Sequence, residues 1–237
     1  MEIVLIICFI AIPIIIISIG LKHDKFKEIM TRPDYQYYNS DYYQITRIPY
    51  KNLNKNTGTQ GEYLTYKQMQ PTLGYKKFIF NAYLTTDNGT TEIDIIMIHT
   101  SGIYVIESKN FHGIILGKQS EQNWTQCLSK KHTYTFYNPI KQNQRHIEAL
   151  KAHIPVLNDE LYKSIIVFSP RADLSGIEND SKAKVINRYD TLITINQLEK
   201  ETPYKLKPEH INKIYDILLK FTYTTDEQRT AHIQQIK

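Results

Sequence analysis

Two carboxylates and a lysine occupy positions from which they could bind a divalent cation. Asp94 lies in the apolar run 92–99, and Glu107 and Lys109 stand two residues apart at the end of the apolar run 102–109. Side chains alternate across a β-strand, so Glu107 and Lys109 share one face of their run. Carboxylates held close together repel, and Mg²⁺ or Mn²⁺ relieves that repulsion through hard oxygen ligands. Such an ion can activate water and stabilise charge on a phosphate.

The turn between the two runs decides how these side chains face each other. A two-residue loop at Thr100-Ser101 places Asp94 directly opposite Glu107, with Cβ atoms about 4.5–5.5 Å apart. A loop shifted by one residue pairs Asp94 with Lys109 instead, and either register gathers the same three side chains on one face. A structural ion pair at a strand end is the alternative interpretation. Spacing alone therefore leaves a catalytic and a structural role open.

The surrounding chain alternates between strand-like and helix-like patterns. Apolar or alternating runs bounded by turn residues predict strands, and amphipathic runs that begin at Pro or end at Gly predict helices. The predicted strands cover 77–84, 92–99, 102–109, 113–117, 134–137, 164–169 and 185–186; the predicted helices cover 61–69, a segment that opens at Pro139, 190–200 and 208–221. Strands mixed with helices in this order indicate an α/β domain.

The composition is that of one globular domain with appendages. The chain has 237 residues, of which 22% are charged and 11% aromatic, and this excludes wholesale disorder. Cys8 and Cys127 are the only cysteines, so a disulfide scaffold and a cysteine-based zinc site are excluded. The balance of 29 basic to 24 acidic residues permits an anionic partner without requiring one. Phosphate-loop, dinucleotide-binding and G-x-S-x-G hydrolase motifs are absent from the sequence.

The N-terminus carries a long uncharged apolar run at residues 3–21. As a helix it would span roughly 28 Å, which matches the bilayer core. Glu2 rather than a basic residue precedes the run and no small-residue cleavage pattern follows it, so we expect a membrane anchor rather than a cleaved signal peptide. Lys22, Lys25 and Lys27 follow at once, which predicts a single-pass protein of the cell membrane with its N-terminus outside and its C-terminal domain in the cytoplasm.

Three further segments are predicted beyond the anchor. Residues 22–57 form a tyrosine-rich juxtamembrane tether, whose tyrosines could stack on bases, lie at the membrane interface or pack on the outside of the domain. We favour the last of these. Residues 58–170 form the core, and residues 171–237 form a C-terminal extension of strand and helix packed on it. That extension could also recruit a protein partner.

Several short motifs of the core, taken in order, resemble the nuclease-related domain, or NERD, family. The motifs are Gly61-Glu62 at the start of a helix, Thr91 to Asp94, Gly102 to Asn110, Gly113, Gly117, Trp124, Asn138 to Ile140, and Gln142-Asn143 with His146. The resemblance covers about residues 58–170. It implies a restriction-endonuclease-like, or PD-(D/E)xK, fold: a mixed β-sheet flanked by helices, with the site at one edge of the sheet.

The resemblance also implies roles for particular residues. Asp94 and Glu107 would hold Mg²⁺ or Mn²⁺ with Glu62 from the first helix, and Lys109 would orient or polarise the attacking water. Gln142 would stand near the site. The expected protein is thus a membrane-anchored, divalent-metal-dependent nuclease that hydrolyses phosphodiester bonds in nucleic acid, with DNA as the expected substrate. The alternative is a membrane-tethered nucleic-acid-binding or scaffolding module with the same fold and no turnover.

Other residues carry weaker signals. Trp124, the sole tryptophan, is expected to be a packing anchor, and Cys127 lacks the neighbours of a nucleophile. His146 lies one turn beyond Gln142 on the same helix face, and we do not count it among the site residues. Basic side chains that could contact phosphates are Lys118, Lys130, Lys131, Lys141 and Arg145.

Overall fold

The computed structural model describes residues 27–86, 89–154, 158–202 and 205–222. Its α-helices are α2 (Pro33–Tyr38), α3 (Asp41–Thr46), α4 (Tyr50–Leu53), α5 (Thr57–Met69), α6 (Pro139–His153), α7 (Thr191–Glu201) and α8 (Pro208–Leu219). Its strands are β1 (Lys76–Thr86), β2 (Gly89–His99), β3 (Gly102–Lys109), β4 (Gly113–Lys118), β5 (Asn123–Ser129), β6 (His132–Tyr137), β7 (Tyr162–Phe168), β8 (Ala172–Glu178) and β9 (Lys184–Asn187).

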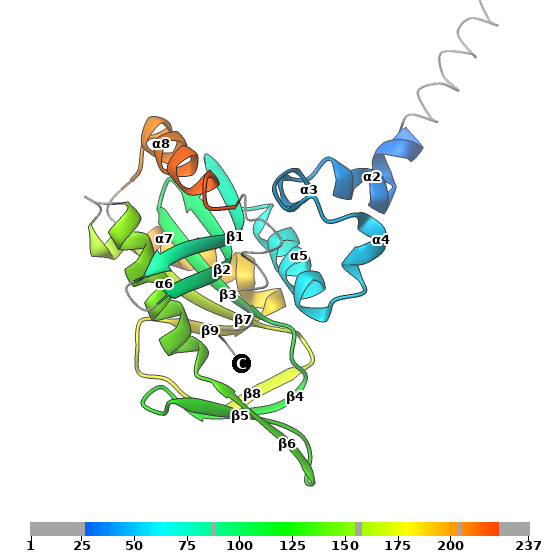
Figure 1. Ribbon diagram of the computed structural model, residues 1–237, viewed down its shortest axis with the longest axis vertical. Coiled ribbons are helices and arrows are strands. Elements are labelled where there is room, and N and C mark those ends of the chain that lie inside the picture. The colour runs from blue at the N-terminus through cyan, green and yellow to red at the C-terminus, as the bar shows by residue number, and fades with distance from the viewer. Residues whose placement is uncertain (1–26, 87–88, 155–157, 203–204, 223–237) are drawn as a thin grey trace, which may run out of the picture.

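The strands form two mixed sheets, one below the other in Figure 1. The five-stranded sheet has the order β1-β2-β3-β7-β9, in which β1, β2 and β3 are antiparallel neighbours and β7 and β9 add in parallel. The four-stranded sheet has the order β6-β5-β4-β8, and β8 pairs with β4 in parallel. The mixed α/β prediction is therefore confirmed, and β8 and β9 make the C-terminal segment part of both sheets.

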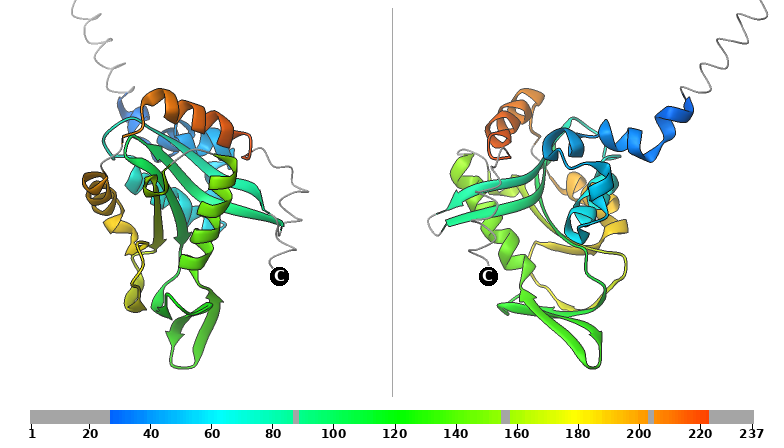
Figure 2. Two further views of the ribbon diagram at one scale, coloured as in Figure 1. Left: turned by 90° about the vertical axis from the view of Figure 1, so that its left-hand side faces the viewer. Right: turned by 45° about the vertical axis from the view of Figure 1, so that its right-hand side comes forward.

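Helices cover both faces of the five-stranded sheet, as the right-hand view in Figure 2 shows. Helices α6 and α8 pack on one face, over β1, β2, β3 and β7, and α3, α5 and α7 pack on the other. The strand residues alternate accordingly: Ile96, Ile98 and Val105 join the core under α6 and α8, whereas Ile95 and Ile106 join the core under α5. Such a sheet, buried on both faces, needs the near-continuous apolar runs that the sequence contains.

A third apolar cluster joins the two sheets. Ile115 and Trp124 from the four-stranded sheet pack with Ile166 and Phe168 of β7. The ring of Trp124 is fully buried and stacks on Phe168, with centroids 6.5 Å apart. The expected packing role of Trp124 is confirmed.

The tyrosine-rich segment is helical over α2, α3 and α4. Tyr37 and Tyr42 are fully buried, and their rings contact Tyr63 of α5 and Phe80 of β1 at centroid distances of 4.9 Å. These two tyrosines pack on the outside of the domain, as favoured above.

The predicted membrane anchor at residues 3–21 lies outside the described residues. Among those that are described, no helix is long and apolar enough to span a membrane.

Candidate active site

The predicted turn is confirmed, and it sets the register of the two central strands. His99 pairs with Gly102, and the ladder runs back from there to the pair Ile95 and Ile106. The next position places Asp94 opposite Glu107. There the Asp94 carboxylate accepts a hydrogen bond from the backbone N–H of Ser108, with Oδ2 and N 2.8 Å apart. A side chain thus takes the place of a ladder hydrogen bond, so Asp94 is fixed between β2 and β3.

Glu107 is the most enclosed of the predicted site residues, with 1% of its surface exposed. Its Oε1 lies 2.5 Å from Nζ of Lys109, and its Oε2 lies 3.0 Å from Nε2 of His146. Burial opposes ionisation, but the charge of Lys109 and the hydrogen bonds from His146 and Lys109 outweigh it and lower the pKa of Glu107 to about 2. Glu107 is therefore an ionised carboxylate inside the protein at neutral pH.

Helix α6 brings two more side chains to this carboxylate. Its N-terminus is capped by Asn138, and Nδ2 of Asn143 donates to the carbonyl oxygen of Val105 in β3 at 2.8 Å. Residues four apart share a helix face, so Gln142 and His146 both turn toward β3. Oε1 of Gln142 accepts a hydrogen bond from Lys109 at 3.2 Å.

His146 is a larger part of the site than we expected from the sequence. A carboxylate only accepts hydrogen bonds, so Nε2 of His146 donates to Glu107. Its other nitrogen, Nδ1, lies 2.8 Å from the hydroxyl of Thr91, and the imidazole is 2% exposed. The contact depends on how α6 rotates against the sheet, which helix periodicity alone does not determine.

Glu62 reaches the same region from α5. Gly61 permits this approach, because a Cβ at that position would stand 2.8 Å from Cβ of Asn110 at the end of β3. The hydroxyl of Tyr42 donates to Oε2 of Glu62 at 3.1 Å. Burial raises the pKa of Glu62 to about 7 despite this hydrogen bond, with Glu92 and Glu107 adding repulsion.

Negative charge exceeds positive charge in this cluster. Burial, followed by repulsion from Glu107 and Glu62, raises the pKa of Asp94 well above its usual value, and Lys109 offsets only part of this. Burial opposes the charge of Lys109 as well, but Glu107 and Asp94 hold its pKa above the usual value. A cation placed among the carboxylates would relieve the remaining repulsion.

The donor set fits Mg²⁺ or Mn²⁺ as a partial shell. Each carboxylate has about four lone-pair sites, so Glu107 can keep Lys109 and His146 and still accept a metal bond. Among the described residues, no three His, Cys, Asp or Glu side chains already stand in a metal-binding arrangement. Mg²⁺ usually retains waters and binds one or two carboxylates together with substrate phosphates, and Asp94 and Glu107 can supply that number.

All five predicted site residues therefore lie in one region, and besides His146 two residues that we did not predict lie with them. Tyr42 contacts Glu62, as described, and the amide of Asn81 of β1 lies near the same carboxylate and opposes the rise of its pKa. The only sequence signal for Asn81 is that a polar amide interrupts an otherwise apolar strand. Tyr42 carries no signal beyond belonging to the tyrosine-rich segment.

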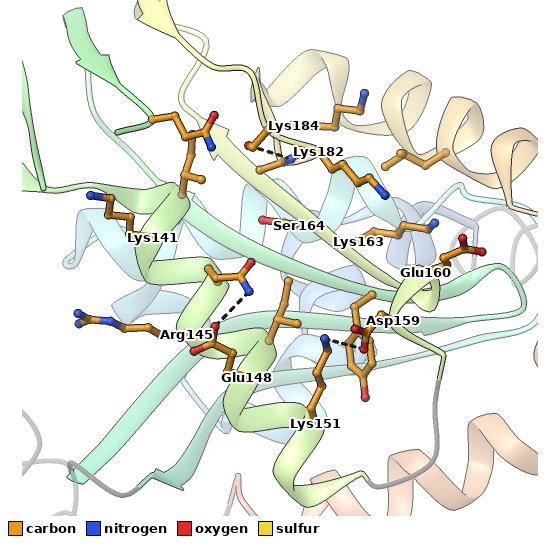
Figure 3. A pocket seen from close by; sticks show the side chains of 18 of the residues that line it. Lys141, Arg145, Glu148, Lys151, Asp159, Glu160, Lys163, Ser164, Lys182 and Lys184 are labelled. Carbon is orange, nitrogen blue, oxygen red and sulfur yellow. Dashed lines mark hydrogen bonds and ion pairs between the residues drawn. The ribbon is translucent and has the colours of Figure 1, made fainter. Parts of the chain in front are cut away.

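A basic groove of about 1180 Å³ lies on another side of α6 (Figure 3). Its floor includes Ser164 of β7. Its six basic side chains come from α6, β7 and the segment entering β9: Lys141, Arg145, Lys151, Lys163, Lys182 and Lys184. Four acidic residues also line it, and one of them, Asp159, pairs with Lys151 at 2.6 Å. The groove thus keeps an excess of positive charge next to the helix that carries Gln142 and His146.

The other predicted phosphate contacts differ in their surroundings. Lys118 forms an exposed ion pair with Glu178 at 2.9 Å, and Lys130 and Lys131 lie at the exposed turn between β5 and β6. Only Lys141 and Arg145 of the predicted basic side chains line the groove.

Comparison with known proteins agrees with the geometry. Residues 57–169 match the family model described as the nuclease-related domain. An uncharacterized protein of Bacillus anthracis is 29% identical over 199 residues, which cover 81% of this chain and 89% of that protein. No solved structure matches the chain. The matched segment begins with α5 and ends after β7, so it includes every predicted site residue; residues 57–169 of this chain form a nuclease-related domain.

Proposed function

We propose that this protein is a divalent-metal-dependent nuclease that hydrolyses phosphodiester bonds in nucleic acid, with DNA as the substrate. One observation carries the proposal: Asp94, Glu107 and Lys109 converge in a largely buried cluster inside a nuclease-related domain, and the carboxylates of this cluster outnumber its one lysine. Apolar surroundings make such a cluster costly, so it is better explained by a ligand that it binds than by stability.

The side chains divide the work of the reaction. Asp94 and Glu107, with Glu62 beside them, would hold Mg²⁺ or Mn²⁺, which supplies Lewis acidity and lowers the pKa of a bound water. Lys109, fixed by Glu107 and Gln142, would orient the attacking water and stabilise charge on the phosphate. His146 keeps Glu107 ionised and in place, and is thus a positioning residue.

The basic groove supports nucleic acid as the partner. Lys163, Lys182 and Lys184 make no ion pair within the described parts of the chain, and burial, with Lys182 nearby, lowers the pKa of Lys163. A phosphate backbone would neutralise these lysines. We expect a Lys182→Gln, Lys184→Gln variant to bind DNA more weakly, with a slope of log affinity against log salt reduced by about 1 for each phosphate that the variant no longer neutralises. Lys130→Gln, Lys131→Gln at the exposed turn is the control.

Membrane attachment is a separate part of the proposal. It rests on the uncharged run at residues 3–21 and the lysines that follow it, and it would place the nuclease-related domain in the cytoplasm. Extraction of bacterial membranes at alkaline pH tests it: the full-length chain should stay in the pellet, whereas release into the supernatant would contradict an integral anchor.

Incubation of the full-length chain, purified in detergent, with linear, circular and single-stranded DNA tests the nuclease proposal. We expect cleavage with Mn²⁺ or Mg²⁺, none with EDTA, and none by Asp94→Ala. Equal cleavage by Asp94→Ala would place the activity elsewhere. DNA binding without cleavage by the unaltered protein would favour the alternative, a nucleic-acid-binding or scaffolding module.

A further inference from the structure

Strand β1 contains an unusual backbone conformation at Asn81. Its φ is 52°, and Arg47 is the only other non-glycine residue with a positive φ in the described parts of the chain. Asn tolerates the left-handed region better than most residues, but it is strained there and seldom adopts it within a strand. Strain of this kind persists only where the surrounding structure imposes it, and it concentrates at functional sites.

Asn81 lies directly across the sheet from Asp94. Phe80 pairs with Ile95 and Ala82 pairs with Ile93, so the intervening residues of the two strands face each other. The alternation of side chains between the two faces of the sheet is also interrupted at Asn81 in β1 and at Asp94 in β2. Ile79 and Ala82 pack under α6 and α8, as do Ile93 and Ile96, although each pair is three residues apart. Asn81 and Asp94 thus leave the regular pleat together.

The two polar atoms of the Asn81 side chain have different surroundings. The amide group lies near the Glu62 carboxylate and favours its ionised form, so Nδ2 is the atom that faces Glu62. Oδ1 is buried, closed to water and has no hydrogen-bond partner. A buried amide oxygen without a partner costs free energy, so this atom adds a second unfavourable feature to the strained backbone.

We infer that Oδ1 of Asn81 is a ligand of the divalent cation, beside the carboxylates of Asp94 and Glu107. This inference rests on the proposed function. Amide carbonyl oxygens are hard ligands that suit Mg²⁺ and Mn²⁺. Because the amide is neutral, it adds coordination without adding repulsion to the carboxylates.

Two variants separate the roles of the side chain. Asn81→Gly accepts the left-handed backbone without strain and removes the amide. Asn81→Asp keeps an oxygen at the same place, tolerates the same backbone, and removes the amide N–H group that faces Glu62. Arg47→Gly is the matched control, because it relieves the same backbone strain at an exposed position.

Mn²⁺ affinity of the full-length chain in detergent would be measured from the electron paramagnetic resonance signal of free Mn²⁺. We expect Asn81→Gly to bind at least tenfold more weakly than the unaltered chain, Asn81→Asp to bind at least as tightly, and Arg47→Gly to be unchanged. Circular dichroism checks that each variant folds. If Asn81→Gly does not fold, the Mn²⁺ affinity of Asn81→Asp tests whether Oδ1 is a ligand.

Three results would overturn the inference. Asn81→Gly binding within twofold of the unaltered chain would show that Oδ1 is not a ligand. Asn81→Asp as weak as Asn81→Gly would show that the amide acts through Glu62 instead. An unaltered chain that does not bind Mn²⁺ would overturn the nuclease proposal along with this ligand, whereas the first two results leave that proposal standing.

Discussion

Replacement of Lys109 by Met should destabilise the protein by removing the main counter-charge of a buried carboxylate. Met fills a similar volume without charge, so the packing of β3 against α6 is largely preserved. Glu107 would keep only the hydrogen bond from His146, at 3.0 Å. Truncating one member of a buried, hydrogen-bonded ion pair is costly because the other charge stays in a low-dielectric environment.

The pKa of Glu107 gives the magnitude. In the folded chain the pKa is lowered from 4.5 to about 2, and a tenfold change in the ionisation equilibrium is about 1.4 kcal/mol. Ionised Glu107 therefore contributes on the order of 3 kcal/mol, and the charge of Lys109 is the largest single cause that favours this ionised form. Because the folded pKa lies below the unfolded one, this contribution is complete above pH 4.5 and is lost as the pH falls toward 2.

Urea denaturation of the full-length chain in detergent, followed by circular dichroism, measures the effect. Lys109→Met should lose about 3 kcal/mol of unfolding free energy at pH 7, and the difference from the unaltered chain should shrink by about 1 kcal/mol at pH 3.5. Lys118→Met removes a lysine from an exposed ion pair and should leave the urea midpoint unchanged. A Lys109→Met midpoint equal to that of Lys118→Met would refute the reasoning.

Two further predictions concern the scaffold. Burial lowers the pKa of His99, which hydrogen-bonds to Ser101 and to the carbonyl oxygen of Leu73, so the fold favours the neutral imidazole. Thermal stability should therefore fall as the pH drops below 6.5, and His99→Gln should reduce that fall between pH 7 and pH 5. Melting temperatures of the two proteins that fall in parallel with pH would contradict this. A Cβ on Gly117 would stand 2.3 Å from the ring of Trp124, so Gly117→Ala should lower stability by about 1–3 kcal/mol in urea denaturation, and an unchanged midpoint would show that the Trp124 ring moves aside without cost.

Strand periodicity and the short turn at Thr100-Ser101 were enough to predict that Asp94 and Glu107 face each other. Both features are local, because the period of two and the loop length are encoded within a few residues. Asn138-Pro139 likewise marks the start of α6, since a side-chain cap and a fixed φ act within one helical turn.

Features that depend on distant contacts were not predictable in this way. Strands β5 and β8 were not predicted, because their sequences are largely polar and lack a clear alternation, and β8 also pairs in parallel with a strand far from it in the chain. His146 was underrated, because its contact with Glu107 depends on the rotation of α6 against the sheet. The conformation of Asn81 depends on irregular pairing with β2, which no pattern within β1 reveals.

The rate at which full-length protein cleaves end-labelled DNA in Mg²⁺, compared with that of Glu107→Gln, tests the central claim most directly. Gln has nearly the same shape as Glu but lacks the charge that would hold the metal and pairs with Lys109. We predict at least a 100-fold lower rate for Glu107→Gln, about the effect of removing one electrostatic partner of the reacting group, with DNA binding retained. Equal rates for the two proteins, under the same Mg²⁺ dependence, would contradict the assignment of this cluster as the active site.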